Sequence, residues 1–263
     1  MNGVFKGELT AFGDAAALLG LVTPNSAKPG GTLEADLRLS GTAANPQMQG
    51  RVTGEDLRME VPILGTQMRG GRFTANFTND TLKVQDLFVS DAKDGTLTGG
   101  GEFTLGEFAR PIGQLDMTAT NFALLDRRDY EGNVDGSIGF ESTQERAALT
   151  GDVTLNRVEV KEFVAGRVAV IEIPVEEINK PENLDETVIK APPVPIDLDI
   201  NLRAPRRIFV RSRGLDIEMS VDTKIKGTVT EPKLYGQAAV LRGGYKIAGK
   251  TLDFKDGDIV FDG

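Results

Sequence analysis

The residues best suited to bind a ligand are acids at two glycine-containing stretches, because carboxylates can coordinate calcium. These stretches are DAKDG at residues 91–95 and FKDGDIVFDG at residues 254–263. Neither has the spacing of acids that surrounds the ion in an EF-hand calcium loop. Asp-Gly instead favours a tight turn, since both residues tolerate positive φ. We therefore interpret both stretches as turns and predict no metal site.

The composition removes most other catalytic chemistry. The chain has no Cys and no His, which excludes thiol catalysis, histidine triads, haem ligation and the usual zinc sites. The stretch TGGGEF at 98–103 lacks the Lys and the following helix of a phosphate-binding loop, so we interpret it as a bulge or sharp bend. The composition does not exclude a pair of carboxylates that acts as in a glycosidase. However, the acids are spread evenly along polar faces, which does not favour such a pair. We expect no enzymatic activity and no cofactor.

A basic cluster near the C-terminal end could attract anionic phospholipid head groups. Arg207, Arg211 and Arg213 have opposite parity from Ile208 and Val210. In a strand, these three side chains would therefore point away from the apolar face. We interpret them as solvated residues of a polar face. The net charge of −9 argues against general binding of nucleic acid. The cluster consists of Arg203, Arg206, Arg207, Arg211 and Arg213.

Period-2 alternation dominates the chain and predicts the β-strands that must position these residues. Apolar and polar side chains alternate over residues 33–39, 196–202 and 215–225, and in short bursts over 245–261. The spacing predicts an all-β chain of about 14 to 16 short strands. We expect one continuous β domain over residues 1–263.

Helix is predicted at only two places. DAAALLGLV at 14–22 could form a short amphipathic helix ended by Pro24, and NFALLDRR at 121–128 one further turn after an Asn cap. The stretch 176–195 is rich in proline and acids and predicts a long surface loop inserted in one continuous sheet. No run reaches the roughly 18 apolar residues that a membrane-spanning helix needs.

One phrase occurs twice, as GTAANPQMQG at 41–50 and GTVTEPKLYG at 227–236. In both, a glycine follows an alternating strand, proline occupies the connection and a second glycine opens the next strand. Proline suits a turn because it presets φ and donates no ladder hydrogen bond. We infer that one strand–turn–strand unit is used several times, as in arrays that grow in one direction.

Alternating strands leave one apolar face that something must cover, because exposing it would cost about 25 cal/mol per Å². Too few helical residues are predicted to cover it. The sheet could pack on another sheet or close into a filled barrel. It could also curl into a groove that holds an apolar ligand.

The last part of the chain carries a more specific pattern. It has Arg207, Phe209, Val210, Arg211, Arg213, Gly214 and Leu215, then Arg242, Gly243 and Tyr245, and finally Gly257, Ile259, Phe261 and Gly263. With these residues, the stretch 203–263 resembles the conserved C-terminal domain of the TamB family. Residues 30–62 are similar to the start of that domain.

The resemblance implies an AsmA-like, bridge-like lipid-transfer protein. Such proteins are anchored in the inner membrane of Gram-negative bacteria and cross the periplasm as a β-sheet curled into a taco-like hydrophobic groove. They partner the outer-membrane barrel protein TamA through its POTRA domains. They act in phospholipid transport and in outer-membrane protein assembly. By this resemblance we expect the chain to be the outer-membrane-proximal, periplasmic piece of a longer protein whose anchor lies elsewhere.

Under the groove interpretation, phospholipid acyl chains contact the inward residues, and the helix Ala15–Val22 is either a plug in the groove or a cap over the sheet end. The alternative is a protein-binding module that docks an outer-membrane barrel partner, or a nascent outer-membrane protein, by β-augmentation. The expected groove lining is Leu37, Leu39, Ile200, Leu202, Ile217, Met219, Val221, Ile225, Tyr245, Ile247, Leu252, Phe254, Ile259 and Phe261.

Overall fold

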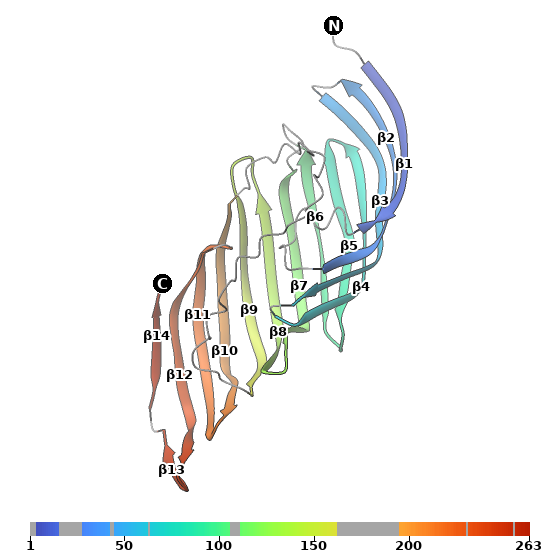
Figure 1. The fold of residues 1–263 in the computed structure, drawn as a ribbon. Coiled ribbons are helices and arrows are strands. Elements are labelled where there is room, and N and C mark those ends of the chain that lie inside the picture. Colours follow the sequence, from blue (N-terminus) through green and yellow to red (C-terminus); the bar gives the residue numbers. More distant parts are fainter. Residues whose placement is uncertain are drawn as a thin grey trace, which may run out of the picture.

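A computed structural model describes the chain at residues 4–15, 28–42, 45–62, 64–105, 111–161, 195–229, 231–254 and 256–263. These residues form one sheet of 14 strands, in which spatial order follows sequence order from β1 to β13. The last strand, β14, pairs with β12 beside β13. Figure 1 shows an open curved sheet, with the N-terminus at the edge of β1 and the C-terminus at the opposite edge.

The strands are longer than the sequence predicted, reaching 17 residues in β3 and β10. Their bounds are β1 Val4–Asp14, β2 Lys28–Thr42, β3 Asn45–Val61, β4 Thr66–Asn79, β5 Thr81–Asp91, β6 Thr96–Leu105, β7 Pro111–Asp126, β8 Tyr130–Ser142, β9 Ala147–Val160, β10 Ile196–Ser212, β11 Leu215–Thr228, β12 Pro232–Ile247, β13 Lys250–Asp253 and β14 Asp258–Asp262.

Neighbouring strands are antiparallel except β9 and β10, which run parallel. A parallel pair needs a long connection, and residues 161–195 supply it here. The sheet therefore continues across the predicted insertion.

The ends of the strands form two rims of the sheet, one on each side. The Thr66 rim carries the ends of β3, β5, β7, β9, β10 and β12, and the Asn79 rim carries the turns after β2, β4, β8 and β11.

The curl of the sheet has two local causes. Bulges shift the register on successive strands, for example at Gly54/Leu57, Val84/Leu87 and Ala119/Phe122, and each bulge bends its strand. Glycines also permit close approach between strands. A Cβ at Gly136 would lie 2.2 Å from the carbonyl oxygen of Asp152, so only glycine fits where the strands bend together.

The repeated phrase forms the same hairpin twice. Gly41 pairs with Pro46 in the β2–β3 hairpin, and Gly227 pairs with Pro232 in the β11–β12 hairpin. The second glycine is equivalent as well, because a Cβ at Gly50 or Gly236 would meet the carbonyl oxygen of an aspartate on the preceding strand. The reuse of a strand–turn–strand unit is confirmed for these two hairpins. The details differ from the prediction, because Pro46 and Pro232 already belong to β3 and β12, and Gly50 and Gly236 lie inside these strands rather than at their start.

The all-β prediction is confirmed, whereas neither predicted helix is borne out. Asp14 is the last residue of β1 and pairs with Thr32, so of the helix predicted at 14–22 only Ala15 is both described and helical. Residues 16–22 lie outside the described residues, as does nearly all of the loop predicted at 176–195. The turn predicted at 121–128 is instead the end of β7, because Phe122 and Ala123 pair with β8.

Candidate functional site: the apolar face of the sheet

Strand register places the apolar residues of the whole sheet on one side, because directly paired residues project to the same face. Leu37 pairs with Leu9 at the first strands, and Leu149 pairs with Phe140 and Leu198 in the middle. We call this side the inner face and the opposite side the outer face. The predicted lining residues that lie in strands all fall on the inner face. The pairs that show this include Leu39 with Met48, Ile200 with Ile225, Leu202 with Thr223, Val221 with Ala238, Met219 with Val240, Ile217 with Val210, Tyr245 with Leu252, Ile247 with Lys250, Ala238 with Ile259 and Gly236 with Phe261. Phe254 directly follows β13.

The central part of the inner face is packed. Side chains of β7 to β10 form a buried cluster, here called the central core, in which Phe122 is 3% exposed. The predicted lining residues Ile200, Leu202 and Val221 pack against it. The cluster consists of Ala119, Phe122, Val134, Val153, Leu155, Val158 and Ala204. In this part the curl lets the sheet cover its own apolar side chains.

A polar tie at the Thr66 rim holds the curl of the central strands. Thr66 is 1% exposed and donates its hydroxyl to the carbonyl oxygen of Leu124 at 2.5 Å. Asp91, 4% exposed, accepts the N–H groups of Lys93, Gly95 and Ala123 at 2.7, 3.0 and 2.7 Å. Together these contacts, here called the rim tie, join the start of β4 and the β5–β6 turn to the end of β7. They also confirm that DAKDG forms a turn, although neither Asp94 nor Gly95 has the positive φ that Asp-Gly turns favour.

The last strands leave the same inner face open. Ile247 is 51% exposed, Leu252 59%, Phe254 40% and Ile259 50%. These four residues are called the C-terminal apolar patch. By contrast Leu37 and Ile217, on the same face, are each 8% exposed. About half of the surface of each patch residue is exposed, so this apolar surface is available to a ligand or partner.

The outer face carries the charges. Arg203 approaches Asp152 and Asp222 at 3.8 and 3.9 Å, and Arg211 pairs with Asp216 at 3.3 Å. The guanidinium groups of Arg157 and Arg211 lie 5.3 and 5.2 Å from the centre of the Phe209 ring, within reach of a cation–π contact. Arg203 and Arg211 of the basic cluster therefore point away from the inner face, as parity predicted for Arg211.

Hydrogen bonds on the outer face favour the charged forms of its ions. The side-chain hydrogen bond from Arg157 lowers the pKa of Glu159, and the backbone N–H of Asn121 lowers the pKa of Asp135. The hydrogen bond to Glu131 raises the pKa of Lys161. All these groups are charged at neutral pH, so the outer face stays strongly hydrated.

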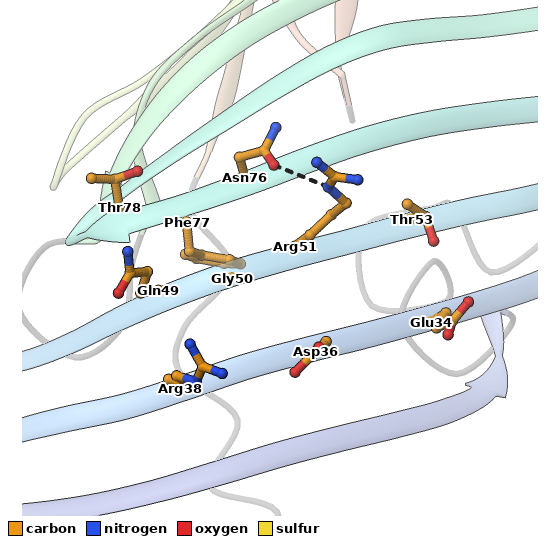
Figure 2. Close-up of a pocket in the computed structure, with 10 residues that line it drawn as sticks. All are labelled: Glu34, Asp36, Arg38, Gln49, Gly50, Arg51, Thr53, Asn76, Phe77 and Thr78. Carbon is orange, nitrogen blue, oxygen red and sulfur yellow. Dashed lines mark hydrogen bonds between the residues drawn. The ribbon is translucent and has the colours of Figure 1, made fainter.

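A hollow of the outer face over β2, β3 and β4 has a polar lining (Figure 2). Arg51 donates to the side-chain oxygen of Asn76 at 3.3 Å there, and Asp36 and Arg38 lie on the neighbouring strand. The described residues contain no group of three or more potential metal ligands. Among them, no helix has the length and apolar character needed to cross a bilayer. The chemistry of this hollow is that of a solvated polar surface.

A single-layer sheet with one apolar and one charged face defines an open β-groove protein. The chain belongs to the TamB family, because the profile of the TamB C-terminal domain matches residues 85–263. That family acts in lipid transport or outer-membrane assembly, works with TamA and places this domain in the periplasm. The matched residues run from within β5 to the end of the chain, so the resemblance noted at 30–62 stays a prediction. No solved structure matches the chain.

Proposed function

We propose that the inner face carries phospholipid acyl chains between membranes, at the outer-membrane-proximal end of a periplasm-spanning, inner-membrane-anchored protein. The observation that supports this most is the open inner face of the last strands, where Leu252 and Ile259 are half exposed. An acyl chain placed there removes apolar surface from water on both partners, and each buried CH₂ contributes about 0.8 kcal/mol.

This mechanism needs few specific polar contacts. The head group stays at a rim in water, while the acyl chain lies across inner-face residues of several strands. Where the inner face is open, along the last strands, neighbouring strands present similar apolar side chains, so the free energy of an acyl chain changes little between them. We propose transport by binding alone, without catalysis and without a cofactor.

The partner in this proposal is a TamA-like outer-membrane barrel protein with POTRA domains. A second function, β-augmentation, is supported by the two edges of the sheet. The outer edge of β1 and the outer edges of β13 and β14 have no paired strand among the described residues. Unpaired backbone groups at such edges can accept a strand of a barrel partner or of a nascent outer-membrane protein.

Adjacent residues of β14 provide a matched test of lipid binding. Ile259 lies on the inner face, whereas Val260, 74% exposed, lies on the outer face. We expect Ile259→Arg to lose most of the phospholipid that co-purifies with the wild type, and Val260→Arg to keep it. The measurement is mass spectrometry of an organic extract of each purified protein.

Equal lipid content in the two variants would contradict the groove proposal, as would a wild type without bound phospholipid. Unfolding in urea checks that both variants are folded. A photo-crosslinker at Met219, compared with one at Ser220 on the opposite face, reports the same contact in cells. Capture of strand peptides that survives Ile259→Arg would support β-augmentation instead.

A further inference from the structure

The β12–β13 hairpin at the Thr66 rim ends in a tight turn and protrudes from the sheet. Its turn is Ala248-Gly249, both at positive φ (48° and 78°), as in a tight two-residue hairpin turn. The backbone N–H of Lys246 donates to the carbonyl oxygen of Gly214 at 2.8 Å, which holds the hairpin beside the β10–β11 turn. In Figure 1 the hairpin lies at the lower left, at the end of the sheet opposite β1.

One side of this hairpin is apolar and exposed. Ile247 and Leu252 lie on the inner face, 51% and 59% exposed, and Tyr245 continues the same row toward the groove. Exposed large apolar side chains that cluster at one place mark interaction sites more often than scattered ones do. The hairpin thus extends the apolar lining to the very margin of the sheet.

Positive charges lie on both faces of the hairpin, Lys250 beside Ile247 on the inner face and Lys246 on the outer face. Arg213, Lys246 and Lys250 are exposed at the two adjacent turns. In the described part of the chain none of these three makes an ion pair, whereas Arg211 and Arg242 pair with Asp216 and Glu218. The acid of the hairpin, Asp253, lies at the end of β13 away from the turn.

We propose that the β12–β13 hairpin docks onto a phospholipid bilayer that contains anionic lipid. Cations beside exposed apolar side chains complement a surface with phosphates above an acyl layer. Lys246, Lys250 and Arg213 contact the phosphates, and Ile247 and Leu252 enter the interface. The proposal goes beyond the groove, because the hairpin can bind a bilayer whether or not the inner face carries lipid.

The test is co-sedimentation of the purified chain with vesicles of phosphatidylethanolamine and phosphatidylglycerol. We expect Lys246→Ala with Lys250→Ala to weaken partitioning about 25-fold, since each basic residue near an anionic surface contributes about fivefold. The matched control is Lys226→Ala with Lys233→Ala, an exposed and directly paired set at the other end of β11 and β12. It carries the same charge change and should bind as the wild type does.

Further variants and conditions separate the contribution of the apolar side chains to vesicle binding from that of the charges. Ile247→Ser with Leu252→Ser should weaken binding, whereas Val260→Ser should not, and high salt should weaken binding of the wild type. Equal loss in both lysine pairs, or no binding of the wild type to anionic vesicles, would overturn the proposal. Urea unfolding confirms that each variant is folded. The phospholipid content of the lysine variants distinguishes a failure of docking, which leaves bound lipid in place, from a failure of the groove.

Discussion

The central strands and the last strands present the same alternation but differ in burial. Around Phe122 and Val153 the inner face is closed over a packed cluster, whereas at Leu252 and Ile259 it is open. The central strands have the bulges of β5 and β7 and the rim tie around Asp91. The last strands, β13 and β14, are short and, among the strands that the structure describes, pair with β12 alone.

The difference shows that alternation decides the side on which an apolar residue lies, while curvature decides whether it is covered. A strand that bends strongly brings inner-face residues of other strands within contact. At the end of the sheet, a strand has a neighbour on one side only, so fewer inner-face residues of other strands come within contact of it. The two regions therefore have different roles: the central strands stabilise the fold, and the last strands offer apolar surface.

The largest expected effect comes from the same substitution in both regions. Phe122→Ala should lower the free energy of unfolding by about 3–5 kcal/mol, because it removes a buried ring and leaves a cavity. Phe254→Ala, at a position 40% exposed, should lower it by less than about 1 kcal/mol. Urea unfolding followed by circular dichroism measures both. Similar losses at the two positions would show that the last strands are covered in solution.

A smaller effect is expected at the rim tie. Asp91→Ala removes the acceptor of three N–H groups, two of which are buried, and should cost about 2–3 kcal/mol. Asp94 belongs to the same turn and is exposed, so Asp94→Ala serves as the control. Urea midpoints of the two variants give the comparison. If both variants unfold alike, the tie does not hold the central curl.

The smallest effect concerns pH on the outer face of the central strands. The pKa of Asp135 is lowered in the folded state, first by the N–H of Asn121 and then by the side chain of Asn156. A lowered pKa gives stability that is present above the unfolded pKa of about 3.9 and is lost as pH falls through the folded value. Because the carboxylate of Asp135 is still partly exposed to solvent, the contribution should stay below about 1 kcal/mol.

The corresponding experiment compares the wild type with Asp135→Asn. The variant should be less stable at pH 7, and the difference should shrink between pH 5 and pH 2. Urea midpoints across this range provide the measurement. A difference that stays constant with pH would mean that the hydrogen bonds, rather than the charge of Asp135, stabilise the fold.

Local patterns in the sequence predicted much of this molecule. Alternation at 196–202 and 215–225 identified strands and their apolar side, and the repeated phrase identified two hairpins. The parity of Arg207 and Arg211 placed these two residues on the outer face. These successes share one reason, since each depends on residues that are close in the chain.

The parts that the sequence did not predict depend on distant residues. Asp91 has a turn partner two residues away, Lys93, but also Ala123, which is 32 residues away. The residues around Asp91 in the sequence do not predict the contact with Ala123. The helix predicted at 121–128 failed for a similar reason, because pairing of Phe122 with Val134 on β8 overrides a weak local preference.

The parallel pair β9–β10 has a consequence for how the chain folds. Nearly every other pair of neighbouring strands is joined by a tight turn or a short loop. Each such pair can form its hydrogen bonds stepwise, starting from the connection. The β9–β10 pair must first close the chain between residues 161 and 195, and that closure costs entropy before any ladder bond forms. Folding should therefore proceed as two zipping segments that meet at one slow seam. Amide hydrogens of β10 that face β9 should gain protection after those of the β11–β12 hairpin.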